Sequence, residues 1–587
     1  MTIPSIPADA PFTGDQRIWL NGFMAGLHSR LLAAQEQTAA AGTVARAPIG
    51  ILYGTQTGNA EVLAQEAAAS AKAHGLEPLV LGLDDVDMAR FAGMERVIII
   101  TSTYGEGEMP DNAHLFWQSL SSPEMARLEH MGFAVLGLGD TAYDGFCQAA
   151  KLIDTRLEQL GARRLAARLD CDVDYEKPSA GWLAATLPLF PKGDGDGAIV
   201  LPTGAAQEVS APAAKSGWTR RNPYPASLAV NRRLSGKDSG KDIRHFEFAL
   251  GDSGLTYEAG DALGVIPLND PALVEALLAR LGAKGEAPLP DGDVSLAEAF
   301  TRSLEIRTPS RELVAAIEAR AGDEQLTHVL RHGDKEALDA WLWGRDVLDL
   351  LNLNPTLKFD LSEFLGWLKP LQHRAYSISS SPLAHEGTVH LTIATVRWAA
   401  NGRTHGGVCS TYLAERVAED GTPGIFVSPN KAFRPPADLS APMIMVGPGT
   451  GIAPFRGFLH HRRSQGASGR NWLFFGDQHQ ESDFIYADEL GEMSRDGVLT
   501  RLDLAFSRDQ AEKIYVQTRM RENGRDLFAW LEEGGHFYVC GDASRMARDV
   551  DQALHEVIAT HGKLSADGAA EYVAQMRREK RYQRDVY

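Results

Sequence analysis

Two glycine-containing turns lie far apart in this chain, and each follows a short apolar run and precedes a helical pattern. The first turn, residues 55–60, is rich in hydroxyl and amide side chains; the second, residues 447–451, reads Gly-Pro-Gly-Thr-Gly. Backbone N–H groups at the start of a helix bind phosphate without needing a basic residue. The first turn also lacks the lysine of nucleotide-hydrolysing loops. Because the turns differ in kind, we expect them to bind two different nucleotides.

Composition excludes several classes of protein. The chain of 587 residues is long enough for roughly three to five domains. Its net charge of −19 argues against nucleic-acid binding and fits either simple solubility or docking on a basic partner. We find no run of about 18 apolar residues and no secretory signal, so we expect no membrane association. The cysteines form no C-x-x-C pair, which predicts no bound metal and a reducing, cytoplasmic location; they are Cys147, Cys171, Cys409 and Cys540.

The first third of the chain divides into two patterns. Residues 1–47 hold an amphipathic helix over 15–36 and a tether; the helix is expected either to dock on its own protein or to mediate self-association or partner binding. Residues 48–187 alternate buried strands with helices. Strands are expected at 49–53, 79–81, 97–101 and 133–138, and helices at 60–74, 112–119 and 147–160. This alternation predicts a doubly wound parallel sheet, whose ligands bind outside the carboxyl ends of the strands.

The remaining residues predict a linker and two further domains. Residues 188–215 are rich in Gly, Pro, Ala and Asp, and we interpret them as an interdomain linker. Residues 216–436 predict an antiparallel β-barrel interrupted by a helical insertion at about 270–368. Barrel strands are expected at 243–250, 263–266, 374–379, 388–396 and 424–427. Residues 437–587 return to strand–helix alternation, with strands expected at 443–446, 472–475, 501–506 and 536–539.

Two further loops follow strands of the first α/β domain and place an aromatic residue among glycines. One contains Ser102, Thr103, Tyr104, Gly105 and Gly107, and the other contains Leu138, Gly139, Asp140 and Tyr143. The two tyrosines are suited to sandwich a planar ring by stacking. Three such loops at successive strand ends predict a flavin nucleotide. Its phosphate is expected to contact Thr55, Gln56, Thr57, Gly58, Asn59 and Ala60.

Residues 49–165, with these loops, resemble a flavodoxin, which implies FMN. The second half is similar to the ferredoxin–NADP reductase module, which implies FAD. The residues that carry this second resemblance are Arg374, Ala375, Tyr376 and Ser377 together with Gly407, Val408, Cys409 and Ser410. It implies that Arg374 contacts the pyrophosphate, Tyr376 stacks on the isoalloxazine and Ser377 hydrogen-bonds near N5. It extends FAD binding to Thr392, Ala394 and Trp398.

The segment 507–517 predicts which dinucleotide binds at the second turn. A 2′-phosphate needs a cation with forked geometry and hydroxyl donors, and Arg508 with Ser507 and Tyr515 supplies both. A dinucleotide fold specific for NAD would instead place an acidic residue on the ribose. We therefore expect NADPH, bound by Gly449, Thr450, Ser507, Arg508, Lys513, Ile514, Tyr515, Val516, Gln517 and Asp549.

The reductase resemblance also implies a catalytic group of Ser377, Cys540, Asp585 and Tyr587. Cys540 would lie beside the contact between nicotinamide and flavin, its alternative being a buried core thiol. Asp585 would orient Ser377 and Cys540. Tyr587 would stack on the FAD ring, where the nicotinamide has to bind, and would move for hydride transfer.

The order of flavodoxin, linker and reductase resembles the diflavin reductases over residues 49–587. Stretches 471–476, 506–517 and 580–587 look most like the flavoprotein subunit of assimilatory sulfite reductase. This implies an NADPH-dependent oxidoreductase that passes electrons from NADPH to FAD to FMN. The acceptor would be a sirohaem and iron–sulfur haemoprotein subunit that reduces sulfite to sulfide in cysteine biosynthesis. The alternatives are an electron donor to another soluble acceptor, such as nitrate reductase or an oxygenase, and a flavin-bearing redox interaction module without turnover.

Overall fold

The computed structural model describes residues 46–56, 58–105, 107–141, 145–191, 217–289, 292, 294–331, 333, 335–417 and 421–587. The predicted N-terminal helix and nearly all of the predicted linker lie outside these residues. Among the described helices, none combines the length and apolar character needed to cross a membrane.

The first described unit is a parallel sheet with helices on both faces. Its strand order is β2-β1-β3-β4-β5, with β6 also paired to β4, which is the doubly wound order of flavodoxin-like folds. Separate apolar cores fill the two sides of the sheet. The strands are β1 (Ala47–Gly54), β2 (Leu76–Gly82), β3 (Arg96–Ser102), β4 (Gly132–Leu138), β5 (Arg163–Arg164) and β6 (Leu169–Cys171). The helices are α2 (Asn59–Ala73), α3 (Met88–Ala92), α4 (Asp111–Ser121), α5 (Gln148–Gln159) and α6 (Glu176–Thr186).

The second unit is antiparallel, as predicted. Two sheets, ordered β11-β10-β15-β7 and β12-β9-β8, enclose one apolar core, and a separate hairpin β13-β14 projects from them. This hairpin was not predicted from the sequence, and the expected strand 388–396 ends just before it. The strands are β7 (Tyr224–Pro225), β8 (Ser227–Arg233), β9 (Ile243–Ala249), β10 (Ala262–Ile266), β11 (Arg374–Ser377), β12 (Thr388–Ala394), β13 (Arg397–Ala400), β14 (Arg403–Gly406) and β15 (Gly424–Ser428).

A helical block separates β10 from β11 and has an apolar core of its own. Side chains of Asp270, Ser295, Ser310, Asp346 and Asp360 accept backbone N–H bonds at the starts of its helices. Such caps mark helix starts in the sequence and stabilise each helix by roughly 1 kcal/mol. The helices are α7 (Pro271–Leu281), α8 (Leu296–Arg302), α9 (Arg311–Ala321), α10 (Glu324–Arg331), α11 (Lys335–Leu342), α12 (Val347–Leu351) and α13 (Leu361–Gly366).

The last unit is a parallel sheet ordered β18-β17-β16-β19-β20, with apolar cores on both faces. Its strands are β16 (Met443–Val446), β17 (Asn471–Asp477), β18 (Arg501–Phe506), β19 (His536–Gly541) and β20 (Tyr582–Val586). The sequence reading did not predict β20, whose charged residues hide the strand pattern. The helices are α15 (Ala453–Ser464), α16 (Gln480–Asp483), α17 (Ala487–Arg495), α18 (Val516–Glu522), α19 (Gly524–Glu532), α20 (Met546–Gly562) and α21 (Ala566–Arg578).

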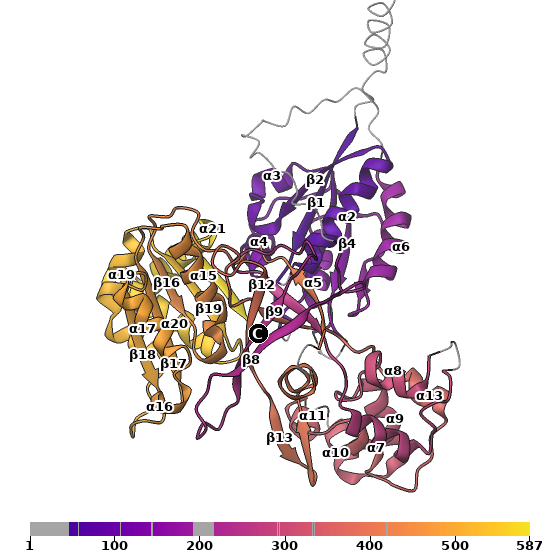
Figure 1. Ribbon diagram of the computed structural model, residues 1–587. Helices are drawn as coiled ribbons and strands as arrows, with labels where there is room; N and C mark the ends of the chain where they lie inside the picture. The colour runs from indigo at the N-terminus through magenta and orange to yellow at the C-terminus, as the bar shows by residue number, and fades with distance from the viewer. Residues whose placement is uncertain are drawn as a thin grey trace, which may run out of the picture.

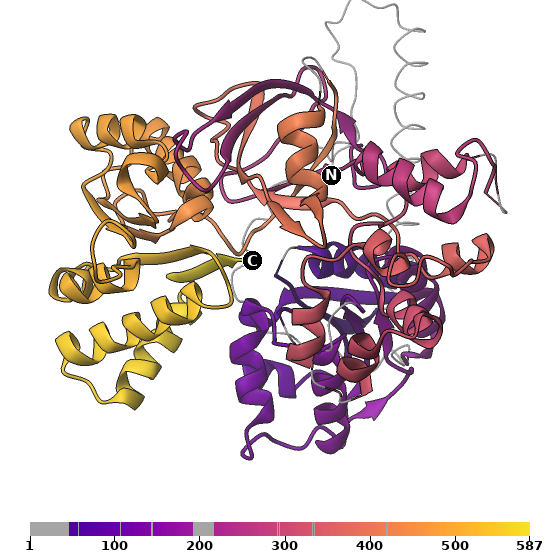
Figure 2. The same cartoon turned by 90° about the horizontal axis from the view of Figure 1, so that it is seen from below.

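These units meet around the C-terminal end of β20. In both views this end lies between the last sheet, drawn in orange and yellow, and the first sheet, drawn in indigo and purple (Figure 1, Figure 2). The antiparallel strands β8, β9 and β12 lie next to the same point in Figure 1. β20, which was not predicted from the sequence, therefore lies where the units meet.

Candidate functional site

The predicted phosphate turn joins β1 to α2. Thr55 accepts a hydrogen bond from the Gly58 N–H (2.9 Å), and its own N–H donates to the Asn112 side chain (2.7 Å). Gly58 has φ 86°, which suits glycine, and no side chain caps α2. The first N–H groups of the helix are thus left for an anion. Gln56 ties the turn to α4 by accepting from the Asp111 N–H (3.0 Å). Asn59 and Ala60 begin α2, and Thr57 lies outside the described residues.

The two predicted ring loops are joined to each other. The Thr103 N–H donates to the Leu138 oxygen (2.9 Å), and its hydroxyl accepts from the Ala149 N–H at the start of α5 (3.2 Å). Gly105 and Gly107 have φ 53° and 131°, values that glycine adopts readily. Tyr143 lies outside the described residues, so the predicted sandwich of two tyrosines stays a prediction.

A cavity of about 770 Å³ lies between the first sheet on one side and the helical block and the antiparallel unit on the other. From the predicted FMN loops it is lined by Asn59, Ser102, Thr103, Tyr104, Gly105, Leu138, Gly139 and Asp140. From the other half of the chain it is lined by Arg374 and Tyr587, which were predicted to contact FAD. Two of the predicted FAD residues therefore share one cavity with the predicted FMN residues. Thr55, Gln56, Gly58, Ala60 and Gly107 shape the loops without lining it. The sequence reading missed three cationic lining residues, Arg220, Arg311 and Lys369.

The R-x-Y-S motif forms β11, and its first residue, Arg374, lines this cavity. The Arg374 guanidinium donates to the Gln372 oxygen (2.9 Å) and lies 3.4 Å from a Glu305 carboxylate oxygen. Ala375 is exposed between Arg374 and Tyr376. Tyr376 faces Cys409, and burial raises the pKa of the Cys409 thiol to about 11. Cys409 is therefore a neutral thiol in the core, and its side chain contacts Tyr376.

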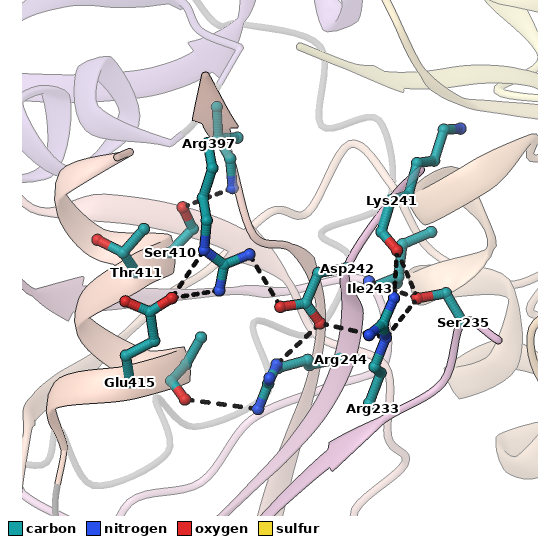
Figure 3. Close-up of polar contacts among 12 residues, drawn as sticks. Arg233, Ser235, Lys241, Asp242, Ile243, Arg244, Arg397, Ser410, Thr411 and Glu415 are labelled. Carbon is teal, nitrogen blue, oxygen red and sulfur yellow. Dashed lines mark hydrogen bonds and ion pairs between the residues drawn. The ribbon is translucent and has the colours of Figure 1, made fainter. Parts of the chain in front are cut away.

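The Gly407 turn leads from the β14 strand into α14 (Val408–Thr411). The Gly407 N–H donates to the Val396 oxygen (3.0 Å), and the Ser410 hydroxyl accepts from the Val396 N–H (3.2 Å). The Ser410 hydroxyl is therefore part of the hydrogen bonding that holds the turn together. Figure 3 shows how Arg397 holds this turn against the barrel by pairing with Glu415 (2.7 Å) and Asp242 (3.0 Å). Val408 and Cys409 are buried at the start of α14.

Three residues assigned to FAD by resemblance lie in other surroundings. The Thr392 hydroxyl is buried and bonds the Tyr486 hydroxyl (2.7 Å). Ala394 ends β12 and packs against the core of the last unit. Trp398 stacks on His405 with ring centroids 5.4 Å apart and donates to the Gly344 oxygen (3.3 Å). None of the three lines the 770 Å³ cavity, so their contact with FAD stays a prediction.

A second cavity, of about 650 Å³, opens at the carboxyl ends of the last sheet. The predicted dinucleotide residues that line it are Gly449, Thr450, Ser507, Tyr515, Val516, Gln517 and Asp549, and Tyr587 lines it as well. Gly449 has φ 58°, and a Cβ on Gly451 would collide with the Cys540 carbonyl group. The Gly-Pro-Gly-Thr-Gly turn therefore needs these glycines in order to approach β19. Gln517 donates to the Asp549 carboxylate (3.0 Å), which joins α18 to α20.

The segment 507–517 forms the outer part of this cavity. The Ser507 N–H donates to the Asp477 oxygen (2.9 Å), and the Arg508 N–H donates to the Gln478 oxygen (2.9 Å). The Arg508 and Lys513 side chains are exposed, Ile514 is half-buried, and neither cation pairs with an acid among the described residues. Two unpaired cations beside hydroxyl donors suit a 2′-phosphate.

Two further cations line the second cavity and were missed by the sequence reading. Arg545 precedes α20, and Lys241 comes from the loop between β8 and β9. Lys241 pairs with Asp477 (2.5 Å), whose pKa is raised by burial. The antiparallel unit thus contributes a cation to the cavity of the last unit. A sequence pattern gives no sign of this contact because 236 positions separate the residues.

The predicted catalytic group comes together at the end of β20. The Ser377 hydroxyl donates to the Asp585 carboxylate (2.5 Å), and the Cys540 sulfur lies 3.9 Å from the same oxygen. Burial raises the pKa of both the Cys540 thiol and the Asp585 carboxyl. The group joins β11, β19 and β20, so it links the antiparallel unit to the last sheet. Cys540 is fully buried yet belongs to this polar group, so the two readings of this residue are compatible.

Tyr587 is the residue that the two cavities have in common. The residue is 62 % exposed, and its hydroxyl shares a hydrogen bond with the Thr450 hydroxyl (3.0 Å). The ring therefore stands between the cavity of the flavin residues and the cavity of the dinucleotide residues.

Comparison with known families agrees with this layout. Residues 51–182 match the flavodoxin family, residues 217–412 match the FAD-binding domain family, and residues 445–552 match the oxidoreductase NAD-binding domain family. This set of domains defines a diflavin reductase. The predicted fold class is confirmed by the same matches and by the observed sheets.

Whole-chain relatives narrow the class. The chain is 42% identical to the sulfite reductase (NADPH) flavoprotein alpha-component of Bacillus subtilis, over 98% of this chain and 96% of the relative. It is 41% identical to the protein of that name from Yersinia enterocolitica, over 98% and 96%. It is 42% identical to that from Vibrio cholerae, over 97% and 93%. The chain belongs to the family of sulfite reductase flavoprotein alpha-components.

The three predicted cofactors are those of the matched domains: FMN, FAD and NADPH. The residues fit these groups. The start of α2 leaves N–H groups for the FMN phosphate, and Arg374 supplies a cation at the FAD side of the shared cavity. The second cavity has the unpaired Arg508 and Lys513 at its outer segment.

Proposed function

We propose that this chain carries electrons from NADPH to a haemoprotein subunit that reduces sulfite to sulfide. The observation that carries the proposal is the position of Tyr587 between the two cavities, together with the shared lining of the larger cavity. An enzyme that accepts a hydride from NADPH and passes on single electrons needs the dinucleotide site next to the FAD site, and the FAD site next to the FMN site. The bound flavins supply the chemistry, because FAD accepts a hydride and FMN passes on one electron at a time.

The chain's own residues position and shield the reacting groups. Arg508, Ser507 and Lys513 select the phosphorylated dinucleotide through its 2′-phosphate. Ser377 and Cys540 are oriented by Asp585, whose pKa is raised by burial. Tyr587 excludes water from the flavin face until the nicotinamide displaces it.

The first unit docks on the rest of the chain through ion pairs. In each pair an acidic residue of the first unit meets a cation of the other units. The pairs are Asp85–Lys580, Asp111–Arg584, Glu61–Lys431, Asp172–Lys369 and Glu176–Arg220. We propose that these acidic residues also receive a basic surface of the haemoprotein after the unit moves away.

Several finer predictions remain proposals. They are the sirohaem of the acceptor, self-association through the N-terminal helix and a cytoplasmic location. The division into 1–47, 48–187, 188–215, 216–436 and 437–587, with its insertion, is a proposal of the same kind.

Reconstitution tests the function. The purified chain, loaded with both flavins, is mixed with a sirohaem haemoprotein subunit, NADPH and sulfite, and sulfide is measured. A fragment over about residues 216–587 should reduce ferricyanide with NADPH and fail to support sulfide formation. Turnover of nitrate but not sulfite with the matching acceptor would favour the alternative donor role. No reduction of any acceptor, with both flavins bound, would favour the interaction module.

A further inference from the structure

The main chain of Tyr587 is fixed on the last sheet. Its N–H donates to the Gly541 oxygen (3.0 Å), and its oxygen accepts from the Ala543 N–H (3.1 Å). The preceding residue, Val586, is paired with Gly541 in the β19–β20 ladder. Any movement of the ring that keeps these bonds has to be a rotation about the side-chain bonds.

The Tyr587 ring, in contrast to its main chain, makes few directed contacts. The residue is 62 % exposed, and among the described residues no aromatic ring stacks on its ring. The hydrogen bond between its hydroxyl and the Thr450 hydroxyl (3.0 Å) is the directed contact that fixes the side-chain rotation. A bond of this kind contributes a modest net free energy, so it can be exchanged during binding.

Thr450 stands on a turn that is itself fixed. The turn η4 (Gly449–Ile452) packs so closely on β19 that Gly451 leaves no room for a Cβ beside the Cys540 carbonyl. The same end of β19 holds the main chain of Tyr587. The two hydroxyls are therefore presented to each other by one rigid element, and Thr450 also lines the dinucleotide cavity.

We propose that Thr450 is a positioning residue that holds the Tyr587 ring between the two cavities and releases it when a dinucleotide binds. The Thr450 hydroxyl bonds either the Tyr587 hydroxyl or the pyrophosphate of the dinucleotide, and the exchange frees the ring to rotate. Binding of the pyrophosphate and release of the ring thus become one event. The inference rests on the proposed function, because it assumes that the second cavity takes the dinucleotide.

A double-mutant cycle on the flavin-loaded chain tests the exchange, with the dissociation constant of NADP⁺ measured by calorimetry. Tyr587→Phe keeps the ring and removes only the hydroxyl bond, so NADP⁺ should bind about fivefold more tightly, the equivalent of about 1 kcal/mol. Thr450→Val removes the hydroxyl and therefore both the bond to Tyr587 and the bond to the pyrophosphate. It should weaken binding several-fold more in the Tyr587→Phe background than in the wild-type chain. Thr450→Ser keeps a hydroxyl and should behave like wild type in both backgrounds.

A fragment of the ligand serves as the matched control. 2′-AMP carries the 2′-phosphate but no 5′-phosphate and no nicotinamide, so none of these variants should change its dissociation constant by more than about twofold. Additive effects of the two substitutions on NADP⁺ binding would overturn the exchange, as would an unchanged affinity of Tyr587→Phe. If wild type binds neither ligand, the proposed function fails instead, so the two failures are distinguishable.

Discussion

The hydroxyl of Tyr104 donates a 2.9 Å hydrogen bond to the main-chain oxygen of Val586, a residue 482 positions later in the chain. Tyr104 belongs to a predicted FMN loop, and Val586 ends β20 next to Tyr587. The bond places the loop of one flavin against the strand that shields the other. Direct transfer between the flavins requires this docked arrangement, so its stability should set the transfer rate.

Tyr104→Phe tests the contribution of this bond. The variant keeps the ring that is predicted to stack on FMN and loses only the bond to Val586. A net hydrogen bond is worth about 1 kcal/mol, so the docked population should fall up to about fivefold. Reduction of FMN by NADPH, followed by stopped-flow absorbance, should slow in proportion, while the FMN content stays unchanged. Equal rates in the two proteins would show that this contact does not limit docking.

The pair of Lys580 and Asp85 offers a charge-swap test of the same interface. Its atoms are 2.8 Å apart, and both side chains are partly exposed. Exposed pairs contribute at most about 1 kcal/mol and are screened by salt. Lys580→Glu should slow FMN reduction several-fold at low ionic strength and have little effect at high salt. Asp85→Lys in the same chain should restore the rate. A double variant as slow as Lys580→Glu would contradict pairing across this interface.

Arg508→Ala tests the choice of dinucleotide. Loss of a charge-assisted contact to the 2′-phosphate costs about 1.5–3 kcal/mol, so the KM for NADPH should rise roughly 10- to 100-fold. The KM for NADH should stay within about twofold, because NADH has no 2′-phosphate. Arg521→Ala, on α18 and paired with Glu556, is the matched control and should alter neither constant. An equal rise for both dinucleotides would remove Arg508 from the phosphate site.

A group of buried histidines predicts acid sensitivity at the junction of the antiparallel unit and the last sheet. Burial lowers the pKa of His245 to about 3, of His385 to about 4 and of His390 to about 2. Unfolded histidine has a pKa near 6.5, so below about pH 6.5 the unfolded chain binds more protons than the folded chain. The stability contributed by these neutral rings is therefore complete above that pH and lost as the pH falls.

Thermal unfolding between pH 7.5 and pH 5 measures this loss. Each neutral histidine lowers the free energy of unfolding by at most about 1.4 kcal/mol per pH unit below pH 6.5. His390→Gln should therefore flatten the pH dependence of Tm relative to wild type. His130→Gln, at an exposed position, is the control and should leave the slope unchanged. A wild-type Tm that does not fall below pH 6.5 would contradict the prediction.

Local patterns predicted the central strands of the two parallel sheets well because these strands are buried on both faces. The strands at 443–446 and 501–506 match β16 and β18 residue for residue. Capping residues such as Ser295 and Asp346 mark the starts of helices in the insertion. By contrast β20, with its Arg and Asp, has no apolar run, and only its pairing with β19 makes it a strand.

The site was predictable where one short motif supplies the chemistry, as at Arg374–Ser377 or the turn at Gly449. It was not predictable where distant segments meet. Lys241 enters the dinucleotide cavity from another unit, and Thr450 meets Tyr587 only because η4 and β20 both pack on β19. Such contacts depend on tertiary structure and leave no periodic signal in the sequence.

The position of β20 at the rim of its sheet has a consequence for solubility. Rim strands carry unpaired backbone groups on one side and invite other chains to add to the sheet. In the structure the first unit docks there through Tyr104 and Arg584. The proposed function requires the first unit to move away, and each such movement exposes the open edge of β20. The charged residues within β20 then act as the safeguard against aggregation, so electron delivery and protection from aggregation depend on the same strand.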